Sequence, residues 1–132
     1  MTQATAHFST ISLVIVSVSD QDRAIDFYVG TLGFEKTVDT PFGNGDRWVE
    51  VSTPVGATTI ALAVPPPGAG TSGGSMTGIS LATPDVDAAH AHLREQGADV
   101  DDLLAVEPPV PPMFFFRDPD GNTLLAVQER PA

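Results

Sequence analysis

Residues 14–34 read VIVSVSDQDRAIDFYVGTLGF and contain two different hydrophobic patterns. Residues Ile11–Val18 predict a strand, because β-branched residues are frequent in this run. Neither of its two alternating faces is polar, so we expect both faces to be covered. Ser19 or Asp20 then offers an N-cap, and the apolar spacing that follows predicts a helix ending near Gly33. This stretch therefore predicts a strand followed directly by a helix.

Three further strands are predicted after this helix, at Phe34–Thr40, Arg47–Thr53 and Thr58–Val64. Turn-forming residues rich in Pro, Gly and Asn separate them. Together with the first strand and helix they make one βαβββ unit. Residues 65–76 are then dominated by proline and glycine, a composition that is typical of a linker or surface loop.

The second half of the chain repeats this order at an offset of 65 residues, which places Asp20 over Asp85 and Leu13 over Gly78. Such a repeat predicts two related modules that share a buried face. The second module is predicted from a strand at Gly78–Thr83, a helix at Asp85–Gln96, an edge strand within 98–112, and strands at Met113–Arg117 and Thr123–Glu129. The predicted organisation is an N-terminal arm (1–9), a first module (10–64), a linker (65–76) and a second module (77–132).

The composition limits the function classes. The 132 residues carry a formal charge of −11, which disfavours binding to nucleic acid or to an anionic membrane. The chain contains no cysteine, which excludes disulfides and thiolate chemistry. Its three histidines offer few ligands for a transition-metal site. We expect a cytoplasmic protein. The acidic charge has two interpretations, solubility or attraction of a cationic ligand.

Two separated motifs resemble one known family. Residues 16–28 with Leu32-Gly33-Phe34, and much later residues 116–122 (FRDPDGN), resemble the vicinal oxygen chelate superfamily, which includes glyoxalase I, extradiol dioxygenases and bleomycin-sequestering proteins. The resemblance implies an α+β fold in which two βαβββ modules form an eight-stranded open cup. It also implies a homodimer, and it leaves open whether modules pair within one chain or between two.

Enzymes of that superfamily hold a divalent metal at equivalent points on the first and fourth strand of each module. The resemblance places these points at Leu13, Ala61, Gly78 and Leu125. None of these four residues has a side chain that donates an electron pair to a metal. We therefore expect neither a metal nor another cofactor.

The predicted ligand-binding face follows from strand alternation and from the aromatic residues. Leu13 and Ile15 should face the cup, as should Gly78 and Ser80 on the matching strand of the second module. Trp48 and Glu50 share a face, where Trp48 forms either a ligand platform or part of the core. The remaining candidate contacts are Ala61, Leu125, Met113, Phe114 and Phe116, with Phe42 as a loop lid. For the phenylalanines the first interpretation is packing in the core, and the alternative is that one face stacks on a planar ligand.

These observations favour a metal-independent protein that binds a small hydrophobic or aromatic molecule. A positive charge on this molecule would favour its binding to the acidic protein. Antibiotic sequestration of the bleomycin-resistance kind is one form of this function. The alternative is an enzyme, either a glyoxalase-like lyase or isomerase that uses Glu50, or a dioxygenase. A third alternative is a scaffold module whose cup is filled by its own side chains.

Overall fold

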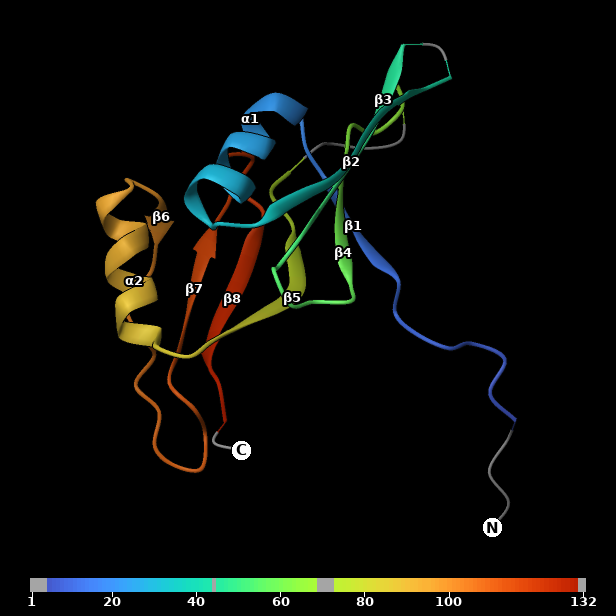
Figure 1. Ribbon diagram of the computed structural model, residues 1–132. Helices are drawn as coiled ribbons and strands as arrows, with labels where there is room; N and C mark the ends of the chain where they lie inside the picture. The colour runs from blue at the N-terminus through green and yellow to red at the C-terminus, as the bar shows by residue number, and fades with distance from the viewer. Residues whose placement is uncertain (1–4, 44, 69–72, 131–132) are drawn as a thin grey trace.

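A computed structural model describes residues 5–43, 45–68 and 73–130, with the side chain of Phe42 left out. The chain forms two open, mixed sheets of four strands each (Figure 1). The first sheet has the order β1 (Leu13–Ser17), β4 (Thr59–Ala63), β3 (Asp46–Ser52) and β2 (Glu35–Phe42). In this sheet β1 is parallel to β4, and the other neighbours are antiparallel.

The second sheet repeats the first. Its order is β5 (Met76–Thr83), β8 (Thr123–Gln128), β7 (Met113–Arg117) and β6 (Asp99–Val100), again with one parallel pair, β5 with β8. The expected α+β fold of two βαβββ modules is confirmed, and β6 is the predicted edge strand. Residues 1–4 of the predicted arm and 69–72 of the predicted linker lie outside the described residues, so the division at 65–76 stays a prediction.

The two helical segments begin at equivalent caps. Asp20 accepts a hydrogen bond from the backbone N–H of Arg23, and Asp85 accepts one from Ala88, both over 3.1 Å. α1 (Gln21–Ile25) continues into the π-helix η1 (Asp26–Thr31), whereas α2 (Val86–Glu95) is a regular helix. The sequence predicted the position of both helices but not the π-helical widening of the first. In η1 the consecutive residues Phe27 and Tyr28 are both buried.

One hydrophobic core joins the two sheets. It contains Val16 and Val49 from the first sheet with Phe116 and Leu124 from the second, and the ring of Phe27 in η1 lies 6.4 Å from that of Phe116. Because side chains alternate along a strand, the opposite face of each sheet must point away from this common core. The fold thus leaves two open faces, one on each sheet.

Candidate ligand-binding face

The open face of the first sheet is built by strand register. Ile15 pairs with Ala61, and Ala61 pairs with Glu50, so β1, β4 and β3 contribute one row of side chains. Leu13 lies beside Thr59 in the next row. The predicted alternation of the first strand is confirmed, since Val16 is buried in the core while Ile15 is 60% exposed. The prediction that Ala61 contacts a ligand is wrong, because its neighbours cover this side chain completely.

Glu50 is held in place on this face by two neutral donors. Thr59 Oγ1 donates to Glu50 Oε1 over 2.6 Å, and Trp48 Nε1 donates to Glu50 Oε2 over 2.7 Å. Hydrogen bonds to a carboxylate favour its charged form. The bonds from Thr59 and Trp48 therefore lower the pKa of Glu50, although desolvation by burial acts against them. The face presents an ionised carboxylate beside the indole ring of Trp48, the only tryptophan of the chain.

The open face of the second sheet forms in the same way. Register places Ser80, Leu125 and Phe115 in one row, and Val127 with Met113 in the next. A groove of about 510 Å³ follows this face. It is lined by Ser80, Ala82, Pro111, Met113, Val127, Gln128, Glu129 and Arg130. The structure therefore brings the predicted contacts Ser80, Met113 and Leu125 together on one face.

The predicted placement of Phe114 and Phe116 on the ligand face is wrong. Both side chains are in the core, with 0% and 1% of their surface exposed. Phe114 packs edge-on against His90 of α2, with ring centroids 4.9 Å apart. The ring on the open face is Phe115, which the sequence reasoning missed. Alternation from Met113 carries the signal, because residues 113 and 115 of a strand must share a face.

The four positions at which the resemblance implies metal ligands do not fit a metal. Leu13, Ala61 and Leu125 are apolar. Gly78 lies in β5 with φ of +75° beside a register shift between Met76 and Ser80, so a side chain there would be strained. Among the described residues, no group of three or more His, Cys, Asp or Glu side chains has the arrangement of a metal site.

The two histidines of α2 lie away from these faces. The ring nitrogens Nε2 of His90 and His92 are within 2.9 Å and 2.8 Å of the backbone oxygens of Asp101 and Thr31, so both histidines contact the chain on the helical side. Phe42 ends β2, but its side chain lies outside the described part of the structure. Its predicted role as a lid stays a prediction.

The turn between β7 and β8 ties the two modules together. Asp118, which is 4% exposed, accepts hydrogen bonds at Oδ2 from Tyr28 and from the side chain of Asn122, and at Oδ1 from the backbone N–H groups of Asp120 and Asn122. Asn122 in turn donates to the backbone oxygen of Ser17 over 2.9 Å. Burial, with Asp118 nearby, raises the pKa of Tyr28 far above its ordinary range. These contacts give Asp118 and Asn122 a structural role in the fold.

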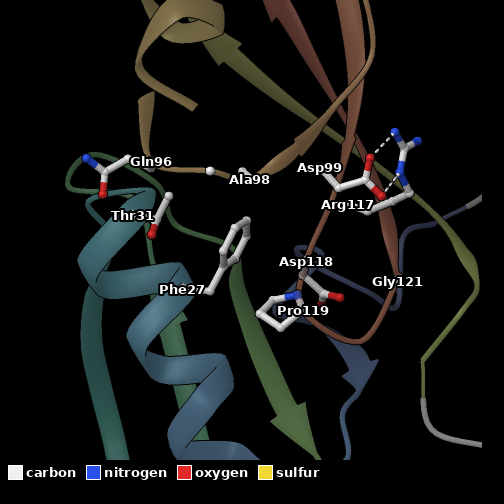
Figure 2. A pocket seen from close by; sticks show the side chains of 10 residues that line it. Phe27, Thr31, Gln96, Ala98, Asp99, Arg117, Asp118, Pro119 and Gly121 are labelled. Carbon is white, nitrogen blue, oxygen red and sulfur yellow. Dashed lines mark hydrogen bonds and ion pairs between the residues drawn. The ribbon is translucent and has the colours of Figure 1, made fainter. Parts of the chain in front are cut away.

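A further pocket of about 410 Å³ lies between η1, the end of α2 and this turn (Figure 2). The ring of Phe27 points into it, and Asp99 and Arg117 form a two-point ion pair at its edge. Arg117 also pairs with Asp101. Because these charges neutralise one another, the pocket offers a ligand no unpaired charge from its arginine, and the open faces remain the better candidates.

The fold and its two open faces define a class of protein, one built from paired βαβββ modules around a potential cup. The family model for the Glyoxalase/Bleomycin resistance protein/Dioxygenase superfamily matches residues 7–125, and the chain belongs to this superfamily. No curated protein matched the chain.

Solved structures give the same result. TnmS3, described as an antibiotic binding protein from Streptomyces sp. CB03234, is 37% identical, with a TM-score of 0.82 over 96% of this chain and 100% of its own. A superfamily member from Sphaerobacter thermophilus DSM 20745 is also 37% identical, with a TM-score of 0.85 over 94% and 100%. Lactoylglutathione lyase from Agrobacterium tumefaciens is 20% identical, with a TM-score of 0.71 over 93% and 96%, and shares the fold. In the described part of the chain, the helices are too short or too polar to cross a membrane.

Proposed function

We propose that this protein binds small hydrophobic or aromatic molecules without a metal, and that it sequesters antibiotics. The observation that carries the proposal is the open face on which Trp48 and Glu50 lie beside apolar rows, while the metal-ligand positions of the superfamily hold no donor. The 37% identity to TnmS3 supports antibiotics as the ligand class. The acidic charge makes nucleic acid and anionic membranes unsuitable partners.

An enzymatic function has less support. A lyase or dioxygenase of this superfamily needs donors at Leu13, Ala61, Gly78 and Leu125, where the chain has none. Glu50 would have to act as a general base, but the hydrogen bonds from Thr59 and Trp48 lower its pKa and so weaken it as a base. The likeness to the lactoylglutathione lyase extends only to the fold. Binding without turnover is therefore the function that the site supports best.

Removal of the indole ring tests the binding face. Trp48→Ala should weaken the tightest-binding compound of a panel of planar aromatic and cationic antibiotics by about thirtyfold or more, the size of a hot-spot contact of about 2 kcal/mol. Isothermal titration calorimetry measures the change. Val55→Ala is the control, because Val55 is exposed in the β3–β4 turn and lines a different pocket. Equal affinity of wild type and Trp48→Ala would place the ligand elsewhere.

We also propose a homodimer in which each cup combines the first-sheet face of one chain with the second-sheet face of the other. Within one chain these faces point away from the common core, so neither can close over the other. Several large apolar side chains outside the core are exposed and would be covered by a second copy. They are Phe8 (92% exposed), Ile11, Ile15, Met76 and Val110.

The substitution Ile15→Lys should convert the dimer to a monomer at micromolar concentration, because it places a charge in the centre of the proposed interface. Sedimentation equilibrium measures the mass, and circular dichroism checks that the fold is kept. Val55→Lys, at a position that is 97% exposed and off the face, should leave the dimer intact. A wild-type monomer at these concentrations would contradict this arrangement.

A further inference from the structure

A cleft of about 330 Å³ lies between the two modules and is separate from the open faces. The first module contributes Leu32 and Phe34, which follow η1, and the turn from Thr53 to Val55 between β3 and β4. The second module contributes one side of α2, through Ala89 and Leu93, with parts of β5, β7 and β8. We call this opening the inter-module cleft. It is complete within one chain, whereas each proposed cup needs two.

The floor of the inter-module cleft reaches the hydrophobic core. Four core residues line it, and none of them has more than 6% of its surface exposed: Leu93, Phe114, Phe116 and Ala126. Their side chains lie on the core side of α2 and of the second sheet, opposite to the open face of that sheet. Since an apolar lining offers water no hydrogen bonds, an apolar molecule that displaces this water gains free energy.

Two polar side chains of the cleft already have partners within the protein. Nε2 of His92 lies 2.8 Å from the backbone oxygen of Thr31, a contact that also joins the two modules. Oγ1 of Thr83 is bonded to the backbone N–H and the backbone oxygen of Asp85, each over 3.3 Å. A ligand therefore gains most of its binding free energy from buried apolar surface and needs few polar groups of its own.

The charge of the lining disfavours anions. Among the described residues that line the cleft, Glu129 is the only carboxylate, and there is no lysine or arginine. Glu129 is exposed, so its negative charge stays in water at the opening of the cleft. An anionic group would leave water without gaining a cationic partner, and Glu129 would repel it.

We propose that the inter-module cleft is a second binding site, which takes a small uncharged molecule with one or two apolar rings. Pockets for small molecules range from about 300 to about 1,000 Å³, so a cleft of about 330 Å³ selects a small one. The site goes beyond the proposed function, because it needs neither open face nor a second chain. Each protein chain then carries a ligand position of its own beside the shared cups.

A single introduced thiol can report on the cleft, because the chain contains no cysteine. Ala89→Cys places a thiol in the lining, where the side chain is half-buried. Ala91→Cys is the matched control, since Ala91 is exposed on the same helix and does not line the cleft. Mass spectrometry measures the rate at which N-ethylmaleimide alkylates each thiol, and circular dichroism checks that both variants keep the fold.

Two probes of one skeleton test both the place and the ligand class. N-phenyl-1-naphthylamine is uncharged, and 8-anilinonaphthalene-1-sulfonate adds one sulfonate to it. At about ten times its dissociation constant, the uncharged probe should slow alkylation of Ala89→Cys about tenfold, because only the unoccupied fraction reacts. Alkylation of Ala91→Cys should keep its rate. The sulfonate should need at least about tenfold higher concentration for the same protection, because its charge would lose water without a cationic partner.

Every other outcome overturns the second site. If Ala89→Cys reacts at one rate at all probe concentrations, the cleft holds no probe. Equal protection by both probes contradicts an uncharged ligand class, and protection of Ala91→Cys as well shows an effect that is not confined to the cleft. A thiol of Ala89→Cys that does not react even without probe shows that the cleft is closed in solution. The proposed function at the open faces is tested separately, by Trp48→Ala with the antibiotic panel.

Discussion

Asp118→Ala should lower the free energy of unfolding by about 3 to 5 kcal/mol. Asp118 is buried and accepts four hydrogen bonds, among them those from Tyr28 and from the side chain of Asn122. Alanine leaves these donors without an acceptor, and each unsatisfied buried group costs about 1 to 3 kcal/mol where water cannot replace the partner. Urea denaturation at one fixed protein concentration measures the loss, because the proposed dimer would make the apparent stability depend on concentration.

Two further variants separate this explanation from a general loss of packing. Tyr28→Phe removes one donor and leaves Asp118 with its other partners, so it should cost only about 1 kcal/mol. Asp118→Asn keeps the shape and part of the acceptor capacity, and should fall between Tyr28→Phe and Asp118→Ala. A loss below about 1 kcal/mol for Asp118→Ala would show that the turn does not lock the modules together.

Phe114→Ala should cost about 3 to 5 kcal/mol, whereas the neighbouring Phe115→Ala should cost about 1 kcal/mol or less. The first removes a ring that is completely buried between β7 and α2, and the cavity left behind adds to the lost transfer free energy. The second removes a ring from an open face. The same denaturation experiment measures both.

For ligand binding, the larger effect should come from Phe115→Ala and not from Phe114→Ala. Phe115→Ala should weaken binding of the tightest-binding compound of the antibiotic panel, because it removes the ring from the open face of the second sheet, while its stability stays close to that of the wild type. If Phe115→Ala is the more destabilising of the two variants, β7 has the opposite orientation, and the assignment of the open face is wrong.

Much of the fold could be predicted because its signals are local. The caps Asp20 and Asp85 stand 65 residues apart, and each precedes an apolar helical pattern. The alternation along the first strand correctly separated Ile15 from Val16. Trp48 and Glu50 were correctly placed on one face, since a separation of two residues in a strand fixes their common side.

The rest depended on contacts between distant residues. Thr59, which holds Glu50, comes from the next strand, and only the register between β3 and β4 brings the two together. Tyr28 and Asp118 are 90 residues apart. The prediction for the three consecutive phenylalanines was wrong for a different reason. An apolar residue at every position does not by itself show which face is buried, and only the shared face of Met113 and Phe115 distinguishes the two.

Native mass spectrometry with elemental analysis tests the central claim most directly. The purified protein is measured before and after addition of divalent metals and of a panel of planar aromatic and cationic antibiotics. We expect no stoichiometric metal under any condition, and a complex with an intact, unmodified drug. Retention of about one tightly held metal ion per cup, or release of a chemically altered drug, would contradict a metal-independent binding function.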